Sequence, residues 1–453
     1  MQVKRILVAV TALAAVAALA GCQSSDDGGN GGSDATSGGE ATSGGDTTSG
    51  DDTTSGGDTD QQTSGEAVEL SLWMLTQDGS QGTGIETIIS GFEAANPGIT
   101  IKLETRETDE HKDAMRQAAG TPAEPDLYFY WEGPGLGGEL VDQGVSLDLT
   151  SYYQQYGWDA RFSEAVLANI TQYGGYHGVP WTIQGEALYY NKDLFAQAGI
   201  DALPTNYDEL VAAADKLVAA GITPISVGGT VNWHVMRVLD SFIEAECGAE
   251  TGNALNTLQA SWADTPCVTE VFTDLKTWGD KYFNEGYMGI DNNQASDLFY
   301  MEVSAMQLEG TWFDAQIVDG GLDPEKVGIL PFPTGTGRLY GFGEALYIGA
   351  QSKHPDEAAK FLDYMSSTST QEQVVGIWGA LSVNKDVAPA TDNPLHALWP
   401  PIFDSATGLY LNNDQNMPLD ATTEYWRIQN SVLTGDIAPE NAGTEFQKFI
   451  DAR

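Results

Sequence analysis

Residues 68–131 read VELSLWMLTQDGSQGTGIETIISGFEAANPGITIKLETRETDEHKDAMRQAAGTPAEPDLYFYW, and this stretch decides the fold class. Its apolar–polar alternation and its helical spacing predict strands over 68–73, 99–105 and 126–131 and helices over 85–95 and 111–119. Strands that alternate with helices are typical of a parallel sheet covered on both faces. The stretch therefore predicts an α/β protein.

The same alternation continues toward the C-terminus. It predicts strands over 188–191 and 222–227 and helices over 207–219, 236–246, 270–283, 361–365, 370–378 and 421–433. No internal repeat is visible in this part of the chain. Its length suggests two domains or lobes.

The first residues have the composition of an export signal. Lys4 and Arg5 precede an apolar stretch over 6–20, which is shorter than the about 20 residues of a membrane-spanning helix. Leu19-Ala20-Gly21-Cys22 resembles a bacterial lipobox, in which the cysteine receives a lipid and becomes the new N-terminus. The alternative is a cysteine that merely follows a signal peptide.

The segment that follows, 22–67, consists almost wholly of Gly, Ser, Thr, Asp and Gln. It cannot bury enough apolar surface to offset its ordering entropy, so we expect it to be disordered. As a flexible coil it would span about 35 to 40 Å, and more where its acidic residues repel one another. The sequence thus predicts an exported body held on a tether at a membrane.

The chain is strongly acidic, with 65 Asp and Glu against 20 Lys and Arg and a formal net charge of −45. This charge argues against nucleic acid or anionic lipid as a partner of the folded part. It is typical of a solubility or salt-adaptation surface. An acidic face that docks a basic partner is the alternative.

Two further cysteines, Cys247 and Cys267, are 20 residues apart. Outside the cytoplasm an isolated pair of this kind usually forms a disulfide. Two free buried thiols are the alternative. A metal site is disfavoured because none of the five histidines lies near either cysteine in sequence.

Motifs of enzymes and cofactor sites are weak or missing. Residues 133–138 match G-x-G-x-x-G after a strand, but they are not in the first strand–helix unit and Pro134 stiffens the turn. A turn at the mouth of a cleft explains them better. The sequence contains no Walker motif, H-E-x-x-H or G-x-S-x-G, and no acid pair stands out as a glycosidase site. We therefore expect no catalytic residue, cofactor or metal.

Aromatic residues are the positive signal. The chain has eleven tryptophans, and several of them stand where predicted strands end or turns begin: Trp73, Trp131, Trp181, Trp233 and Trp312. Indole rings stack on the C–H faces of sugars while nearby polar groups bond the hydroxyls. Core packing is the alternative role for each ring.

Many short motifs occur in a specific order along the body: Leu72-Trp73, residues 92–99 (FEAANPGI), Pro125-Asp126, residues 178–181 (GVPW), 188–195 (LYYNKDLF), Ala198-Gly199, 207–210 (YDEL), 220–224 (AGITP), 304–306 (SAM), 310–312 (GTW), 327–333 (VGILPFP), 341–344 (GFGE) and 352–359 (SKHPDEAA). Together they resemble the carbohydrate-binding solute-receptor lipoproteins of ABC importers, the family 1 group that includes maltose-binding protein. Asn206-Tyr207 departs from the family's usual Thr-Trp at a helix-capping position.

The resemblance implies two α/β lobes with a sugar cleft between them and a first crossing near 183–185. We expect a signal over 1–21, the lipidated cysteine and tether over 22–67, lobe one over 68–183 with 327–350, and lobe two over 184–326 with 351–453. Lobe closure around the sugar would be sensed by the importer's permease subunits. We expect a monomer at the extracytoplasmic face of the bacterial cell membrane, held there by its lipid anchor.

The resemblance also places the binding residues. Trp312 matches the family's stacking tryptophan, Trp131 and Glu132 match a cleft aromatic and its polar partner, and Gln184 aligns with a sugar-bonding acid. The other candidates are Trp181, Asn232, Trp233, His234, the hydroxyl acceptors Asp314 and Glu344, and the tryptophans Trp378 and Trp399.

The expected ligand is a neutral oligosaccharide, because recognition of an anion normally uses Arg or Lys. Only Lys192 and Arg237 lie close in sequence to the candidate site, although the fold can bring Arg338 or Arg427 to it. A tethered extracellular glycoside hydrolase is the alternative from another class. A surface adhesin is a third, favoured only by the tether.

Overall fold

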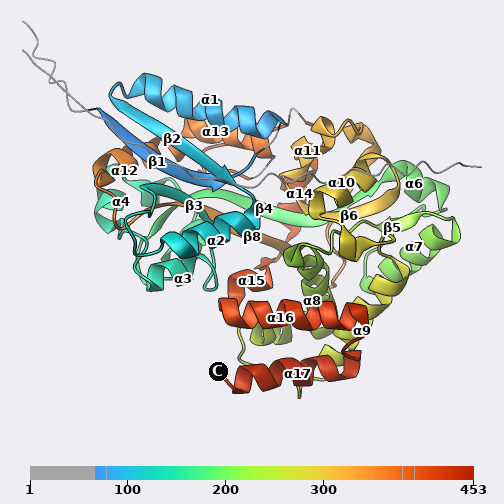
Figure 1. Cartoon of the computed structure of the whole chain (residues 1–453). Coiled ribbons are helices and arrows are strands. Elements are labelled where there is room, and N and C mark those ends of the chain that lie inside the picture. Colours follow the sequence, from blue (N-terminus) through green and yellow to red (C-terminus); the bar gives the residue numbers. More distant parts are fainter. Residues whose placement is uncertain (1–66, 78, 380, 392) are drawn as a thin grey trace, which may run out of the picture. The chain divides into compact units, whose positions relative to one another are not determined.

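The computed structural model describes residues 67–453 apart from 78, 380 and 392 (Figure 1). The predicted signal, Cys22 and the segment up to residue 66 lie outside the described residues. Within the described part, no helix combines the length and the apolar character needed to cross a membrane.

A single sheet of nine strands organises the described residues, in the order β2-β1-β3-β8-β4-β6-β5, with β7 on β4 and β9 on β8. The strands are β1 (Val68–Leu75), β2 (Ile99–Arg106), β3 (Leu127–Trp131), β4 (Gly178–Asn191), β5 (Thr223–Ile225), β6 (Ser304–Gly310), β7 (Val327–Leu330), β8 (Leu339–Ile348) and β9 (Leu409–Tyr410). β1 is parallel to β2 and β3, and β5 is parallel to β6. The α/β fold class is thus confirmed, with antiparallel strands at the centre of the sheet.

The long strand β4 joins the two halves of this sheet. It pairs with β8 from Gly178 to Glu186, and from Glu186 onward with β6 and then β7. Figure 1 shows β4 running across the middle of the molecule, between β3 and β8 at one end and β6 at the other. The exchange of partners lies next to the predicted crossing at 183–185.

Two large hydrophobic cores flank this crossing. One gathers residues such as Leu70, Ile88, Leu127 and Phe361, and the other gathers residues such as Leu188, Leu210, Phe242 and Tyr425; a smaller cluster contains Phe313 and Trp399. We refer to the two large cores with their surrounding elements as the first and second halves. The lobe boundaries within them stay a prediction.

The helices of the described chain are α1 (Gly79–Ala95), α2 (Thr108–Ala118), α3 (Gly137–Asp142), α4 (Thr150–Tyr156), α5 (Glu164–Thr171), α6 (Lys192–Gln197), α7 (Tyr207–Ala219), α8 (Asn232–Asn256), α9 (Cys267–Lys281), α10 (Asn292–Tyr300), α11 (Phe313–Asp319), α12 (Pro355–Met365), α13 (Thr368–Trp378), α14 (Trp399–Ser405), α15 (Asn413–Asn416), α16 (Leu419–Thr434) and α17 (Pro439–Asp451). Each helix expected from sequence is present. The Asn206 side chain accepts a hydrogen bond from Glu209 N–H at 3.0 Å, so it caps α7.

The position of α12 and α13 differs from the expected assignment of 351–453 to the second lobe. Ala358, Phe361, Leu362 and Val374 are fully buried in the first core, and α13 packs beside α1, as Figure 1 also shows. The apolar faces of these helices find their partners on β1, β8 and α1, far away in sequence. By contrast, α16 and α17 pack with α9 in the second half.

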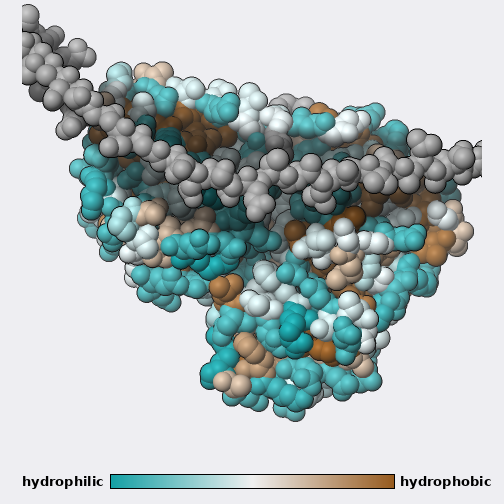
Figure 2. Space-filling model, viewed as in Figure 1, coloured by the Kyte–Doolittle hydropathy of each residue, from teal (hydrophilic) through white to brown (hydrophobic). Residues whose placement is uncertain are grey.

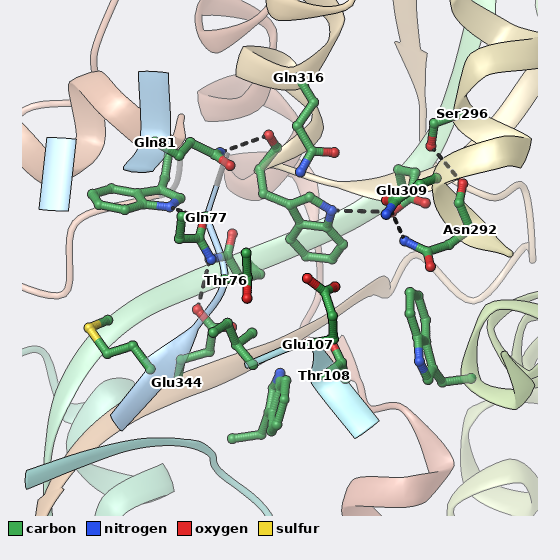
Figure 3. Close-up of a pocket in the computed structure, with 18 of the residues that line it drawn as sticks. Thr76, Gln77, Gln81, Glu107, Thr108, Asn292, Ser296, Glu309, Gln316 and Glu344 are labelled. Atoms are coloured by element: carbon green, nitrogen blue, oxygen red, sulfur yellow. Dashed lines mark hydrogen bonds between the residues drawn. The ribbon is translucent and has the colours of Figure 1, made fainter. Parts of the chain in front are cut away.

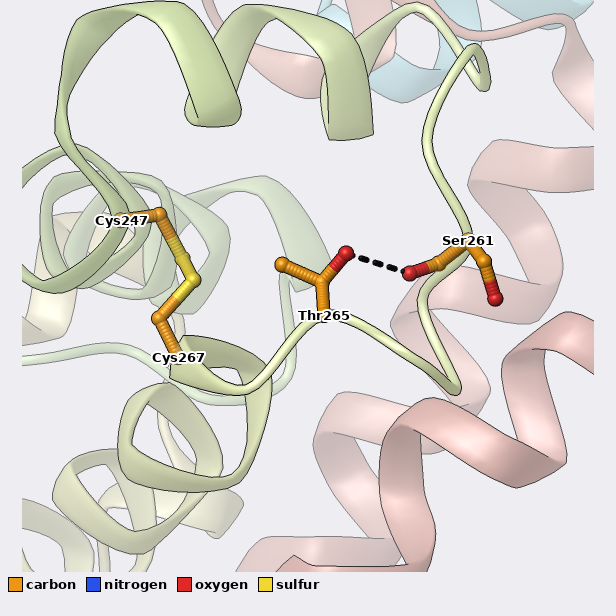
Figure 4. The surroundings of a disulfide bond; sticks show 4 residues. All are labelled: Cys247, Ser261, Thr265 and Cys267. Carbon is orange, nitrogen blue, oxygen red and sulfur yellow. Dashed lines mark hydrogen bonds between the residues drawn. A yellow bond between two sulfur atoms is a disulfide. The ribbon is translucent and has the colours of Figure 1, made fainter.

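A disulfide joins Cys247 and Cys267, with their Cα atoms 5.3 Å apart, which confirms the predicted pair. It connects α8 to the start of α9 (Figure 4). In the loop between them Thr265 Oγ1 donates to the backbone carbonyl of Ser261 at 2.6 Å. The loop that contains Trp262, a fully buried residue of the second core, is therefore tied at its end.

Candidate functional site

A cavity of about 370 Å³ lies between residues of the first half and residues of the second half. The first half contributes residues from β1, α1, α2 and β3, and the second half contributes residues from α8, α10, β6 and α11. In Figure 3, Gln77 and Gln81, Glu107 and Thr108, Asn292 and Ser296, Gln316 and Glu344 surround it from different sides. This volume is within the range of about 300 to 1,000 Å³ typical of small-molecule sites.

The structure brings a subset of the predicted site residues to the cavity wall: Trp131, Trp181, Gln184, Trp233, Trp312, Glu344 and Trp378. It does not bring Glu132, Asn232, His234, Asp314 or Trp399 to that wall. Their contribution to binding stays a prediction in every case.

Trp312 is a half-buried ring at the start of α11. Its Nε1 donates to Glu309 Oε2 at 3.2 Å, and its carbonyl accepts a hydrogen bond from Gln81 Nε2 at 3.0 Å (Figure 3). A Cβ added to Gly310 would lie 2.0 Å from the ring, so this position requires a residue without a side chain. The Gly310–Trp312 spacing noted in the sequence is therefore a steric requirement.

Arg237 on α8 provides a buried positive charge beside this ring. Its Nε lies 2.6 Å from Glu186 Oε1 on β4, and its Nη1 donates to Glu309 Oε2 on β6 at 2.8 Å. Burial works against the charged form of Glu309, but Arg237 and His234 outweigh it and hold the pKa of Glu309 below its usual range. Burial raises the pKa of Glu186 to about 8 despite the nearby guanidinium.

A polar network closes the cavity near the crossing strand. Gln184 Nε2 donates to Glu344 Oε2 at 2.9 Å and to Thr182 Oγ1 at 3.0 Å. Thr182 also donates to Glu344, and Thr311 donates to Gln184. Burial raises the pKa of Glu344 to about 7. Gln184 thus links the two halves through side-chain hydrogen bonds.

The wall formed by the first half combines Trp131 with a buried ion pair. Lys112 Nζ lies 4.8 Å from the centroid of the Trp131 ring and donates to Asp414 Oδ2 at 2.7 Å. The side chains of Lys112 and Asp414 are each 7% exposed. This pair connects α2 with α15, segments that lie 302 residues apart in sequence.

The glycine-rich turn after β3 allows α15 to approach the cavity. Gly135 N–H donates to the carbonyl of Gln415 at 2.8 Å, and a Cβ on Gly135 would lie 2.1 Å from the carbonyl oxygen of Met417. The predicted turn over 133–138 is present between β3 and α3, where it makes room for the backbone of α15. The G-x-G-x-x-G match is therefore explained by close packing.

Residues on and beside α15 were not predicted as part of the site, although Asn412, Asp414 and Gln415 line the cavity. Asp240 holds this segment, because it accepts hydrogen bonds from Asn413 N–H at 2.9 Å and Asn413 Nδ2 at 2.8 Å. Among the described residues, Asn412 Oδ1, Asp414 Oδ1 and Gln415 Oε1 are buried without a hydrogen-bond partner. Buried polar atoms normally have a hydrogen-bond partner, so these three acceptors are unsatisfied in this part of the chain.

The candidates away from the wall have other neighbours. Burial raises the pKa of Glu132 to about 8 and that of Asp314 to about 8. Asp314 accepts hydrogen bonds from Tyr189 at 2.7 Å and from Trp399 at 3.1 Å. Glu132, Asp314 and Trp399 are therefore buried in the protein, and Trp399 is hydrogen-bonded to Asp314.

The two remaining candidates are at the start of α8. His234 Nε2 lies 3.2 Å from Glu309 Oε1, directly behind the cavity wall. Asn232 accepts a hydrogen bond from Asn430 at 2.7 Å.

Three basic residues line the cavity: Arg106, Lys112 and Arg237. The sequence pointed to Arg237 and Lys192, and Lys192 does not line it. Lys112 and Arg237 are in the ion pairs described above, and Arg106 Nη2 donates to Glu104 Oε2 at 3.0 Å. Arg338 and Arg427 do not line it; they pair with Glu244 and Glu424. The cations at this wall are thus already neutralised by carboxylates.

No group of three or more His, Cys, Asp or Glu side chains within the described ranges has the arrangement of a metal site. The visible face of α16 and α17 is mostly hydrophilic in Figure 2. These helices carry acidic residues such as Asp420, Glu424, Glu440 and Glu445, in agreement with the net charge.

Comparisons with known proteins agree with this architecture. The chain is 28% identical over 364 residues to the "Multiple sugar-binding protein" of Streptococcus mutans, which covers 77% of this chain and 84% of that protein. It matches the solved structure of a "Chitin oligosaccharide binding protein" with a TM-score of 0.78, 25% identity and coverage of 86% of this chain and 99% of the other. It also matches "SBP RafE in complex with raffinose" with a TM-score of 0.68 and 21% identity, covering 84% and 98% of the two chains, which supports the fold alone.

The family described as "Bacterial extracellular solute-binding protein" matches residues 76–372, well over half of the chain. This match spans most of the elements that form the cavity, from α1 to the first residues of α13. The chain therefore belongs to the bacterial extracellular solute-binding protein family, whose members bind solutes and are not enzymes.

Proposed function

We propose that this protein is an extracytoplasmic substrate-binding lipoprotein that captures a neutral oligosaccharide and delivers it to the permease of an ABC transporter. The observation that carries the proposal is the chemistry of the cavity wall. Its aromatic rings stand beside buried hydrogen-bonding atoms that have no partner among the described residues, whereas each of its basic groups is already paired with a carboxylate.

This combination suits a sugar better than an anion. A sugar offers apolar C–H faces for rings such as Trp312 and Trp131 and hydroxyl groups for Asn412, Asp414 and Gln415. An anion would have to compete with Glu186 and Glu309 for Arg237 and with Asp414 for Lys112. The names of the sugar-binding relatives support the same substrate class.

Lobe closure is the proposed mechanical step. The cavity takes residues from both halves, and contacts such as Gln81 with the Trp312 carbonyl and Ser80 with Asp319 join α1 to α11 across it. A ligand that contacts both halves at once favours the closed arrangement in an open–closed equilibrium. Scattering should then give a smaller radius of gyration for the sugar-bound protein than for the free protein; an unchanged radius would indicate a rigid lectin-like module.

The proposed anchor is the lipid on Cys22, followed by the tether over 22–67. It would confine the receptor near the importer and so raise its effective concentration there. A tether shortened to a few residues should impair sugar uptake by cells and leave the affinity in solution unchanged. If uptake persists at the wild-type rate, the tether has no role in delivery.

Binding assays with purified full-length protein test the function itself. Xylotriose, maltotriose, raffinose and tri-N-acetylchitotriose are incubated with the protein, and thermal shift and calorimetry measure binding while chromatography detects products. Binding without cleavage supports a receptor, whereas the release of shorter sugars would indicate the alternative of a glycoside hydrolase.

The same assay separates neutral from charged ligands. A ligand at 100 times its dissociation constant adds about 2.7 kcal/mol of stability, which is readily measured. Stabilisation by uronic or phosphorylated sugars, with none from the four neutral trisaccharides, would overturn the assignment to a neutral sugar.

A further inference from the structure

Arg237 is not needed as an anion receptor in a site for neutral sugars. It is 6% exposed, it carries a full positive charge into the cavity wall, and it stands one helical turn after Trp233 on α8. A neutral ligand offers no anion for it to bind. The reason for a buried charge at this position is therefore sought in the contacts of Arg237 within the protein.

The guanidinium lies between two carboxylates from two different strands. Nε faces Glu186 on β4 at 2.6 Å, and Nη1 faces Glu309 on β6 at 2.8 Å. Nη1 is hydrogen-bonded to Glu309, whereas the contact of Nε with Glu186 is an ion pair without hydrogen-bond geometry. The hydrogen bond and the ion pair together restrain the position of the planar Arg237 group between β4 and β6.

Two tryptophan rings pack around this fixed cation. The Cζ atom lies 4.6 Å from the centroid of the Trp233 ring and 5.0 Å from the centroid of the Trp312 ring. Both distances are within the roughly 6 Å range of cation–π attraction, which strengthens when the cation is desolvated. Both rings line the cavity, so Arg237 connects two parts of its aromatic wall.

Glu309 connects Arg237 to the indole nitrogen of Trp312. The same Oε2 atom that accepts from Arg237 also accepts from Trp312 Nε1 at 3.2 Å. On its other side, Oε1 faces His234 Nε2, and His234 Nδ1 accepts from Gly228 N–H at 3.0 Å, which places the ring proton toward the carboxylate. Trp312 is thus held both at its nitrogen and by its contact with Arg237.

We propose that Arg237 is a positioning residue that holds Trp312 and Trp233 in their sugar-stacking orientation before the ligand arrives. A wall that is set in advance avoids the loss of side-chain freedom on binding, which otherwise weakens affinity. The proposal rests on the proposed sugar-binding function for its effect on affinity, but the orientation of the rings is a property of the ligand-free protein. The two can therefore be tested separately.

The first test uses full-length protein labelled with 5-fluorotryptophan and no ligand. The fluorine signals of Trp312 and Trp233 are assigned by Trp312→Phe and Trp233→Phe. Arg237→Met is expected to shift and broaden both signals and to leave those of Trp158 and Trp262, which are buried away from the cavity wall, unchanged. Unchanged Trp312 and Trp233 signals would overturn the proposal.

Arg237→Lys separates charge from geometry. A lysine keeps the charge but lacks the planar group that bonds Glu309 and packs against both rings, so the two fluorine signals are expected to stay perturbed. Full recovery by lysine would refute the role of the planar group. If Arg237→Met does not fold because it leaves the Glu309 carboxylate buried without its cation, the pair Arg237→Met with Glu309→Gln removes one charge of each sign, keeps an acceptor for Trp312 Nε1 and serves in its place.

The second test measures affinity for the four neutral trisaccharides. Arg237→Met is expected to weaken binding at least tenfold in the wild-type background and less than twofold in a Trp312→Ala background, because it acts through that ring. Equal losses in both backgrounds would show that Arg237 acts independently of Trp312. If the wild-type protein binds none of the four sugars, the proposed function fails, while the fluorine signals still decide the positioning role.

Discussion

Replacing Trp312 by alanine is expected to reduce sugar affinity by about two orders of magnitude. A tryptophan side chain buries roughly 150 to 250 Å² of surface. In this protein Arg237 and Phe342 already pack on the ring and Gly310 lies under it, so we assign about half of that area to a ligand. At roughly 25 cal/mol per Å², about 100 Å² of lost contact corresponds to about 2.5 kcal/mol, or about 70-fold in the dissociation constant.

The assay is calorimetric titration of Trp312→Ala with the sugar that stabilises the wild-type protein most. Trp426→Ala is the matched control, because Trp426 is also half-buried and also donates its indole N–H, to Met236 Sδ at 3.1 Å, but does not line the cavity. The control is expected to keep wild-type affinity even if it lowers the melting temperature. Wild-type affinity in Trp312→Ala itself, or an equal loss in both variants, would refute the assignment of this ring to the ligand.

Three further substitutions test separate parts of the structure. Burial raises the pKa of Asp314 to about 8, so between pH about 4 and 8 the native protein binds more protons than the unfolded chain and loses stability as the pH rises. Asp314→Asn should make the melting temperature depend less on pH in this window. Equal slopes of melting temperature against pH in the two proteins would contradict the argument. Changing Cys247 and Cys267 together to serine should cost about 3 kcal/mol and lower the melting temperature by about 4 °C with sugar affinity unchanged; a shift below 1 °C would contradict this. Lys112→Met leaves the Asp414 carboxylate buried without its cation and should destabilise the protein by about 3 to 5 kcal/mol in urea unfolding, whereas adding Asp414→Asn should restore most of the loss.

The elements of this fold were largely predictable because their signals are local. The boundaries of α7 follow from a capping asparagine and helical spacing, and β1 follows from its alternation. The packing of α12 and α13 was not predictable in the same way. Their apolar faces specify that they are buried but not which core buries them, and the chain returns to the first half only through contacts with α1, β1 and β8.

The candidate site likewise contains residues that a local sequence signal predicts and residues that only distant contacts bring together. Trp131 and Trp312 are found from sequence because each follows a strand within a recognisable motif, and the structure places both at the cavity wall. Lys112, Asp414 and Gln415 carry no local signal, since they become neighbours only when segments about 300 residues apart meet. Asp314 is the opposite case: it follows a recognisable motif, but its carboxylate does not line the cavity and accepts hydrogen bonds from Tyr189 and Trp399 instead.

The position of Glu186 connects the binding wall to the crossing strand. It is the last residue of β4 that pairs with β8 and the first that pairs with β6, and its side chain faces Arg237. The charge cluster that orients the aromatic wall is therefore attached to the segment that joins the two halves. A ligand that binds best to the present orientation of Trp312 and Trp233 also stabilises this arrangement of β4, because the same ion pair belongs to both. We therefore expect stacking on the wall to favour one arrangement of the halves through Arg237 and β4.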